Sequence, residues 1–405
     1  MRPGCWYRIS GNSPDLGLPA TPIGTRYLQD NDPARDPTLN PPTSLKERAR
    51  RLAGRAWQAP WSGRVGFPAI TEAWNGAAYA SRLGRAGSLI VYGGGHDDYF
   101  GSDVHAFDVG RREWRRLTTG FVTGGARDYG RGATYPDAVY PDGSPLPPHT
   151  YDYLQYDEVG NNVVLLKGQT ELGTAVKAAS IPHVFNLDTL TWRRGPRHPS
   201  AILNSGGFTT WDAARRLLWG HSGDDGGGNA FVAYRPDGEN PDATVGAWEV
   251  FYPNKLPGEA NHNAMQLHPL ADAIVVALHA RDALSVIDPQ RPADPATPLA
   301  SIGRRPNIQP YAALEYSVAA DSLVYYSAVG GSGVYAIDWD AKARWRALHV
   351  PTSLDPAADA ARRSRYHVNP AHTFGRFRLA HFGAVDLALL IRHVDSPVYA
   401  MLLTG

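Results

Sequence analysis

The sequence predicts an all-β fold, a closed β-propeller of six blades, and three observations support that prediction. Glycine (42 residues), proline (33), tyrosine (20) and tryptophan (11) are abundant in a chain of 405 residues. Glycine and proline mark turns, and aromatic side chains suit half-buried strands, so this composition favours many short strands. The other two observations are a repeating four-strand unit and an N-terminal strand that completes the last repeat.

The repeating unit is clearest between residues 75 and 117. A strand with small and aromatic residues, 75–81, is followed by an apolar strand that ends in glycines, 88–95. A third strand, 104–108, ends in aspartate, and a tryptophan-containing strand, 113–117, closes the unit. Repeats of this length are typical of propellers, in which each repeat forms one four-stranded blade.

Five further copies follow the first. The second to sixth copies span residues 149–194, 207–251, 263–288, 311–348 and 374–403. The fourth copy has no closing tryptophan, and the sixth ends after its third strand.

The N-terminal residues supply the missing strand. The sequence Trp-Tyr-Arg-Ile at 6–9 matches the closing strands that contain Trp114, Trp192, Trp248 and Trp345. We therefore expect residues 1–10 to form the outer strand of the last blade, which removes an exposed sheet edge. A seven-bladed propeller is the alternative, if residues 11–67 form a degenerate copy.

Residues 11–67 differ in composition from the repeats. They are rich in proline, aspartate and arginine and contain one helix-like stretch, 44–57. We expect a Pro-rich arm that lies across the propeller formed by residues 68–405. A disordered linker is the alternative.

The blade pattern resembles the kelch superfamily, whose propeller fold is shared with galactose oxidase. The residues that carry the resemblance are the glycines of Tyr92-Gly93-Gly94-Gly95 and the later pair Phe107 and Trp114. Residues 73–79 followed by 91–99 look like uncharacterised bacterial and phage kelch proteins. The resemblance covers 68–405 and implies the fold without implying an activity. Copper-radical chemistry of the galactose oxidase kind is not expected, because the one cysteine, Cys5, falls in the predicted outer strand.

Charge and targeting signals limit the partners. The formal net charge is +1, so nothing favours nucleic acid or an anionic membrane. The N-terminus shows no apolar signal-peptide core, and no run is long enough for a membrane span. We expect a virion or cytoplasmic protein without membrane insertion, which acts extracellularly if it is part of a virion.

Polar residues gather in the loops between the second and third strands, which share one face with the connections between blades. The predicted ligand-binding residues of these loops are His96, Asp97, Asp98 and Tyr99, then His221, Asp224 and Asp225, then His279, and finally His393. A second ring precedes the innermost strands. It contains Asn75, His149, Asn204, Asn261, Gln309 and Thr373, flanked by His262 and His372.

The same residues have a structural interpretation, because Asp and Gly are common in turns and channel-end polar groups bind water. No cofactor or metal is predicted, although Asp97–Asp98 or Asp224–Asp225 could bind Ca²⁺ through carboxylate oxygens. Four further histidines, His105, His183, His268 and His349, are interpreted as structural.

Three functions follow as hypotheses. The first is a glycan-binding or receptor-binding module of a phage virion or tail, with residues 11–67 contacting other virion proteins. The second is a polysaccharide lyase, in which His149, His96 and Tyr151 supply the acid and base and Arg281 or Arg392 neutralises a uronate. The third is a protein-interaction scaffold.

Overall fold

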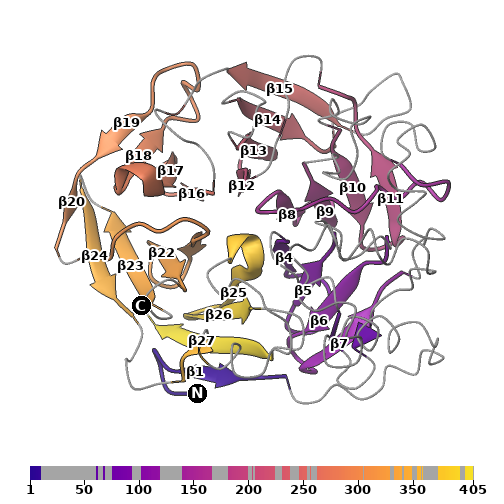
Figure 1. Ribbon diagram of the computed structural model, residues 1–405, viewed down its shortest axis with the longest axis horizontal. Coiled ribbons are helices and arrows are strands. Elements are labelled where there is room, and N and C mark those ends of the chain that lie inside the picture. Colours follow the sequence, from indigo (N-terminus) through magenta and orange to yellow (C-terminus); the bar gives the residue numbers. More distant parts are fainter. Residues whose placement is uncertain are drawn as a thin grey trace, which may run out of the picture.

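The computed structural model shows six four-stranded units arranged in a ring (Figure 1). It describes residues 1–10, 61–62, 67–68, 75–93, 102–118, 139–166, 181–198, 203, 206–223, 230–237, 246–252, 256, 262–303, 305–328, 333–339, 342–348, 354–356, 358, 373–392 and 397–404. Within these residues the sheets form a six-bladed β-propeller, as the repeats predict. Outside the blades, β2 (Trp61–Ser62) pairs with β3 (Phe67–Pro68). The rest of 11–66, including the helix expected at 44–57, lies outside the described residues.

Every blade is an antiparallel sheet whose first strand lies nearest the axis (Figure 1). Blade 1 contains β4 (Ala77–Ala80), β5 (Ser88–Val91), β6 (His105–Asp108) and β7 (Glu113–Arg116). Blade 2 contains β8 (Leu154–Asp157), β9 (Asn162–Leu165), β10 (His183–Asn186) and β11 (Thr191–Arg194). Blade 3 contains β12 (Phe208–Asp212), β13 (Leu217–His221), β14 (Phe231–Arg235) and β15 (Ala247–Tyr252).

The second half of the chain repeats this order. Blade 4 contains β16 (Ala264–His268), β17 (Ala273–Leu278), β18 (Ala283–Ile287) and β19 (Thr297–Leu299), with a 3₁₀ turn, η3 (His279–Arg281), before β18. Blade 5 contains β21 (Ala313–Ser317), β22 (Ser322–Ser327), β23 (Gly333–Trp339) and β24 (Ala343–Ala347), with β20 (Ser301–Ile302) parallel to β24. Blade 6 contains η4 (Phe374–Arg376), β25 (Phe377–Phe382), β26 (Val385–Ile391) and β27 (Val398–Thr404).

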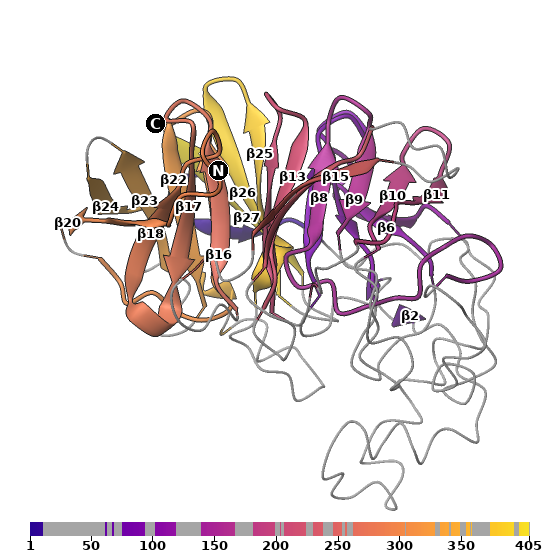
Figure 2. The ribbon, with the colours of Figure 1, turned by 90° about the horizontal axis from the view of Figure 1, so that it is seen from above.

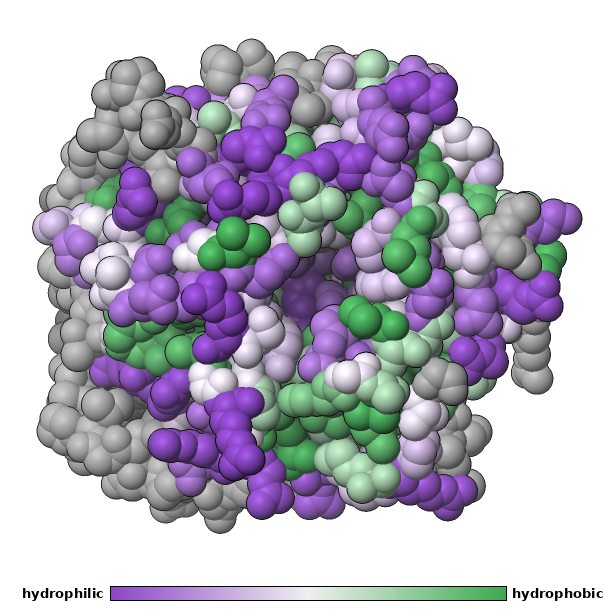
Figure 3. All heavy atoms as spheres, turned by 180° about the vertical axis from the view of Figure 1, so that it is seen from behind, coloured by the Kyte–Doolittle hydropathy of each residue, from purple (hydrophilic) through white to green (hydrophobic). Residues whose placement is uncertain are grey.

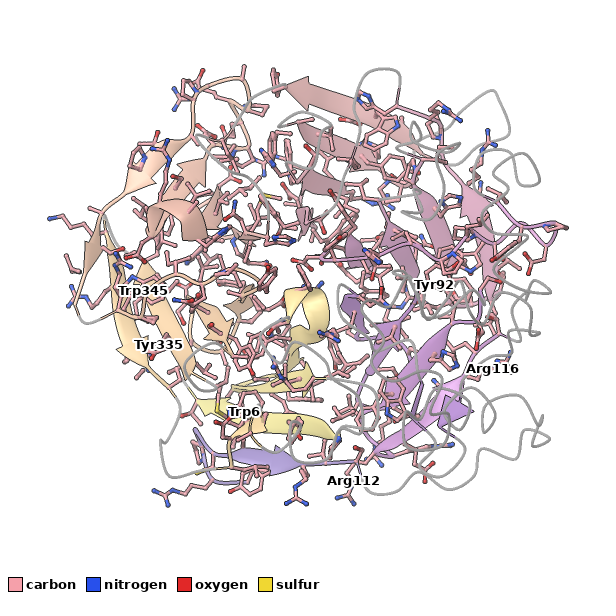
Figure 4. All side chains as sticks on the ribbon, in the orientation of Figure 1. Trp6, Tyr92, Arg112, Arg116, Tyr335 and Trp345 are labelled. Atoms are coloured by element: carbon pink, nitrogen blue, oxygen red, sulfur yellow. The ribbon has the colours of Figure 1, made fainter. Side chains whose placement is uncertain are left out.

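The N-terminal strand β1 (Trp6–Arg8) completes blade 6, which confirms the predicted closure. It pairs antiparallel with β27, with Trp6 opposite Met401 and Arg8 opposite Tyr399. The Trp6 indole is 3% exposed and packs edge-on against Tyr326 of blade 5 at 5.9 Å. Figure 4 shows Trp6 and Trp345 on the outer strands of neighbouring blades, the position that the closing tryptophans were predicted to hold.

The turns between first and second strands are fixed by short-range hydrogen bonds. In blade 2 the carboxylate of Asp157 accepts from the N–H groups of Val159 (3.1 Å) and Gly160 (3.0 Å). Asp212, His268 and Ser317 occupy the same position, and each accepts from the backbone N–H three residues later. Such side-chain caps specify a tight turn from local sequence alone, which explains why the repeats could be recognised.

The alternation of turns and loops gives the ring two different faces. The turns between first and second and between third and fourth strands lie on one face, here called the turn face. The loops between second and third strands and the connections between blades lie on the other, the loop face. Figure 1 looks onto the loop face, where η3 and η4 lie, and Figure 2 shows the loop face below and the turn face above. In the part of the chain described here, no helix is both long and apolar enough to cross a membrane.

Two local features were not predicted as the structure has them. The fourth copy has no closing tryptophan, and its closing strand, which the sequence analysis did not identify, is β19 (Thr297–Leu299), paired with β18. A proline is tolerated there because the outer strand is a sheet edge. His221 was expected in a loop, but it is the last residue of β13 and pairs with both Phe208 and Phe231.

Candidate functional site

Four aromatic or imidazole side chains meet near the axis on the loop face. Tyr151, His262, Tyr311 and Phe374 each lie two or three residues before the first strand of blades 2, 4, 5 and 6. All four have a left-handed backbone, with φ of 43°, 58°, 64° and 44° in that order. Non-glycine residues rarely adopt this conformation, and bulky ones do so only where the surroundings enforce it. We call these four residues the axial cluster.

Backbone hydrogen bonds between blades hold the axial cluster in place. The N–H of His262 donates to the carbonyl of Gly206 (2.8 Å), and the N–H of Tyr311 donates to the carbonyl of His262 (3.0 Å). The N–H groups of Thr373 and Phe374 both donate to the carbonyl of Tyr311, at 3.1 and 3.3 Å. This chain of bonds runs from blade 3 to blade 6 around the axis and offsets the strain of the left-handed residues.

The side chains of the axial cluster contact one another as well. The ring centroids of His262 and Tyr311 lie 4.6 Å apart, and those of Tyr151 and Phe374 lie 5.2 Å apart in an edge-to-face arrangement. Phe374 also contacts Tyr311 at 5.5 Å, which closes the group. Tyr151 and Phe374 are 3% exposed, whereas His262 and Tyr311 are partly exposed. The cluster therefore combines two buried rings with two partly exposed rings.

Blade 1 contributes a backbone segment, at Gly76, that lies close to Tyr151. Gly76 precedes β4, and its N–H donates to the side-chain hydroxyl of Thr150 at 2.7 Å. A Cβ atom at Gly76 would lie 2.0 Å from the carbonyl oxygen of Tyr151. Only glycine fits there, so the entrance to blade 1 is shaped to accommodate Tyr151.

Polar side chains extend the cluster. The Nδ1 atom of His149 and the Oη atom of Tyr151 form a hydrogen bond of 3.1 Å, and His149 is 1% exposed. Arg392, which is 3% exposed, donates from Nη1 to the hydroxyl of Thr373 at 3.1 Å, directly before Phe374. An imidazole, a phenol and a guanidinium are thus anchored at or beside the same group of rings.

A buried group of three charged side chains, here called the ion cluster, lies near the axis. Its members Arg378, Asp152 and Glu315 follow residues of the axial cluster closely in sequence. Arg378 of β25 donates to Asp152 through Nη2 and to Glu315 of β21 through Nη1, both at 2.5 Å. The same guanidinium donates to the carbonyl oxygens of Ala77 (2.8 Å) and Leu154 (3.0 Å). One side chain therefore connects blades 1, 2, 5 and 6, and it binds Asp152, the residue that follows Tyr151.

Burial dominates the titration of Asp152. Removal from water raises its pKa to about 7, against the opposing effect of Arg378 and with a further increase from Glu315. The pKa of Arg378 is raised because its two carboxylate neighbours outweigh its own burial. The ion cluster is thus held by opposite charges in a largely buried site.

The structure brings together some of the predicted site residues. His149, Tyr151 and His262 meet in or beside the axial cluster, and Arg392 reaches it through Thr373. Ten predicted residues lie outside the described part of the chain, namely His96, Asp97, Asp98, Tyr99, Asn204, Asp224, Asp225, Asn261, His372 and His393. The two candidate Ca²⁺ loops are among them.

His279 and Arg281 lie on η3 of blade 4. The Nδ1 atom of His279 lies 2.9 Å from Oδ1 of Asn263, which follows His262 of the axial cluster. Arg281 is exposed. Within the described residues, no three His, Cys, Asp or Glu side chains are grouped as metal ligands.

His221 is placed in the core. Its imidazole is fully buried, stacks on Phe208 with ring centroids 5.1 Å apart, and lies 2.7 Å from the carbonyl oxygen of Ser222. Burial lowers the pKa of His221 to about 4, so the ring is neutral at neutral pH. A direct contact with a ligand would require this stack to open.

Sequence reasoning missed Phe374 and the ion cluster. Phe374 lies three residues before its first strand, as Tyr151 does, so an alignment of the blades could have revealed it. Arg378 and Asp152 are 226 residues apart, and no local pattern connects them.

Comparisons with known proteins add little to this geometry. No protein-family model and no curated protein matches the chain. Among solved structures, a structural genomics protein of unknown function from Bacteroides thetaiotaomicron VPI-5482 is similar, with 8% sequence identity and a TM-score of 0.48. The similarity covers 84% of this chain and 71% of that chain. It supports no inference about function.

Proposed function

We propose that this propeller is a kelch-like binding module whose loop face recognises a glycan. The observation that carries the proposal is the axial cluster, where four blades hold aromatic and imidazole rings together at the channel end. A sugar offers C–H faces that stack on rings and hydroxyl groups that need hydrogen-bond partners. The partly exposed rings of Tyr311 and His262 supply both kinds of contact.

The backbone of the cluster supports this proposal. Strained left-handed residues concentrate at ligand sites, where rigid placement of side chains reduces the ordering that binding requires. The chain of hydrogen bonds from Gly206 to Phe374 fixes Tyr311 and His262 before any ligand arrives. The cluster is therefore preorganised.

The biological setting that we propose is a phage virion or tail, where the glycan belongs to a host-cell surface. The support is the resemblance of 73–79 and 91–99 to phage kelch proteins, together with the proline-rich composition of 11–67. In this setting residues 11–67 contact other virion proteins. Deletion of 11–67 should then prevent incorporation into the particle while glycan binding remains.

The first test is a substitution that removes an exposed ring without disturbing the left-handed backbone. Tyr311→Asn does so, because asparagine tolerates positive φ. We expect at least about a fivefold loss of affinity for glycans selected on an array, since stacking on one ring contributes roughly 1 kcal/mol or more. The measurement is calorimetric titration, with circular dichroism to confirm folding.

Tyr316→Asn is the matched control. Tyr316 is a partly exposed tyrosine near the turn-face end of β21, in the same blade, and its hydroxyl donates to Asp321. This variant should bind glycan as the unsubstituted protein does. Equal losses in the two variants, or no loss with Tyr311→Asn, would remove the basis of the proposal.

A second candidate is a lyase acting on acidic polysaccharide, and the 3.1 Å contact between His149 and Tyr151 favours it. In β-elimination a base removes the C5 proton, the C4–O bond breaks as an acid protonates the leaving oxygen, and a C4=C5 double bond forms. An imidazole and a phenol in contact suit these proton transfers, and Arg392 or Arg281 suits the uronate carboxylate.

The lyase candidate is tested by absorbance. Unsaturated uronate formed from a polyuronate would establish turnover, and His149→Gln should then abolish product while binding persists. Binding without any product across the polyuronates tested would leave the binding module as the function.

A further inference from the structure

Several exposed apolar side chains lie on the turn face, opposite the axial cluster. Among the described residues, the large apolar side chains that are exposed are Met1, Val159, Leu190, Leu270, Val318 and Phe382. Four of them lie in turns of this face, namely Val159, Leu190, Leu270 and Val318. Phe382 is the last residue of β25, at the same face, and Met1 precedes the outer strand β1. Exposed apolar side chains that lie together on a surface are candidates for contact with a partner.

Four of these side chains form a rim around the axis. Val159, Leu270 and Val318 occupy the turns after the first strands of blades 2, 4 and 5, and Phe382 ends the first strand of blade 6. They are 53%, 74%, 54% and 40% exposed. First strands lie nearest the axis, so these turns encircle the channel mouth. Figure 3, which looks onto the turn face, shows separate hydrophobic side chains around a central hollow with hydrophilic walls.

The ion cluster supplies polar groups along this channel. Its side chains Arg378, Asp152 and Glu315 are 5%, 8% and 13% exposed, so Glu315 is the most accessible of the three. The Oε1 atom of Glu315 accepts from Arg378, and no side chain among the described residues donates to Oε2. One guanidinium faces two carboxylates, so the cluster has no unmatched positive charge and has acceptor capacity left.

The depth of the channel suits a long side chain. Val318 follows Glu315 by three residues along β21 and its turn. At about 3.3 Å per residue, Glu315 lies roughly 10 Å below the rim. Lysine and arginine have flexible apolar stems and cationic ends, so they can pass a rim of apolar residues and place a donor near a carboxylate.

We propose that the turn face docks a protein partner that inserts one lysine or arginine into the channel mouth and packs apolar side chains over the rim. Val159, Leu270, Val318 and Phe382 supply the apolar contact, and Glu315 accepts from the inserted cation. A second copy of this chain fits less well, because two turn faces meeting on a shared axis would place Glu315 opposite Glu315. The docking surface is independent of the glycan proposal, since it lies on the other face.

The test uses cyclic peptide libraries whose central position is fixed as Lys, Arg, Gln or Glu and whose flanks are random. Selection against the full-length protein should enrich Lys- and Arg-centred peptides with apolar flanks. The double variant Leu270→Ser and Val318→Ser should raise their Kd at least tenfold. Both side chains are exposed, so this variant should fold.

Two further variants locate the contact. Glu315→Gln should also raise the Kd at least tenfold, whereas Tyr311→Asn on the loop face should leave it unchanged. Failure to enrich any peptide, enrichment of Gln- or Glu-centred peptides, or an unchanged Kd in the rim variant would overturn the proposal. Concentration-dependent self-association that disappears in the rim variant would assign this face to a second copy and would overturn it equally.

Discussion

The loop face and the turn face both contain residues with positive φ, but they hold them by different means. On the turn face, Asn161, Asp272 and Asp321 adopt φ of 52°, 47° and 43° within turns that are capped by a side chain from the preceding strand. On the loop face, Tyr311 and Phe374 adopt 64° and 44° and are held by hydrogen bonds from other blades.

The difference separates local from tertiary control of the backbone. Asparagine and aspartate tolerate the left-handed region, so these three turns are specified by residues close in sequence. Aromatic residues do not tolerate it readily, so the loop face needs the assembled ring to hold them. Conformations that only the whole fold can enforce are expected at a functional site, which is why the axial cluster is the stronger candidate for glycan binding.

The largest expected effect comes from the ion cluster that links the blades. Arg378→Met leaves Asp152 and Glu315 buried without a cation, and we expect the free energy of unfolding to fall by about 3–5 kcal/mol. Equilibrium denaturation measures the loss.

Arg346→Met is the control for this prediction. Arg346 and Asp338 form an exposed pair, with side chains 46% and 38% exposed, so its removal should change stability by less than about 1 kcal/mol. Similar losses in the two arginine variants would contradict the idea that tertiary contacts at the axis dominate.

An intermediate effect concerns acid stability near the loop-face end of blade 3. Burial lowers the folded pKa of His221 to about 4, below its ordinary value of 6.5. The unfolded chain therefore binds a proton first, so the stability from neutral His221 is complete above about pH 6.5 and declines as the pH falls to about 4. The expected decline is roughly 3 kcal/mol.

His221→Phe should keep the stack on Phe208 and flatten this pH dependence. Denaturation curves collected across this pH range for both proteins give the comparison. A slope that is unchanged in the variant would assign the acid sensitivity to other groups, of which His183 is the next, because burial lowers its pKa to about 3.

The smallest effect tests local control at the turn face. Leu190 has φ of 56° in the turn between β10 and β11 and is 39% exposed. Leu190→Gly should stabilise the protein by up to about 1 kcal/mol, because glycine accepts positive φ without a steric penalty.

Leu270→Gly serves as the comparison, because Leu270 is not among the described residues with positive φ. It should be neutral or destabilising by up to about 1 kcal/mol. Stabilisation by both substitutions would show that backbone strain is not what distinguishes the two turns.

The sequence predicted the fold well because the blades are specified locally. The strand pattern recurs along the chain, and Trp6 matches the tryptophans of the closing strands, so the number of blades and the closure by β1 were both readable. The closing strand β19 was missed because a proline-containing edge strand has no such signature.

The site was predicted only in part, for a related reason. Counting back from each second strand identified His149 and pointed to its neighbours Tyr151 and His262, because these residues lie at nearly the same position in each repeat. The contact of Arg378 with Asp152 across 226 residues and with Glu315 across 63 depends on ring closure, and no sequence period encodes it. The burial of His221 was likewise not predicted, because the sequence does not show at which residue β13 ends.

The pairing of β1 with β27 determines how the ring would respond to mechanical load. Residues 6–8 pair antiparallel with residues 399–401, so the start of β1 and the end of β27 leave the sheet on the same side. A force pulling these two ends apart would break the hydrogen bonds one after another, as in unzipping, instead of loading them together. Blade 6 would open first, at its outer strand, and Trp6 would be the first large side chain withdrawn from the core.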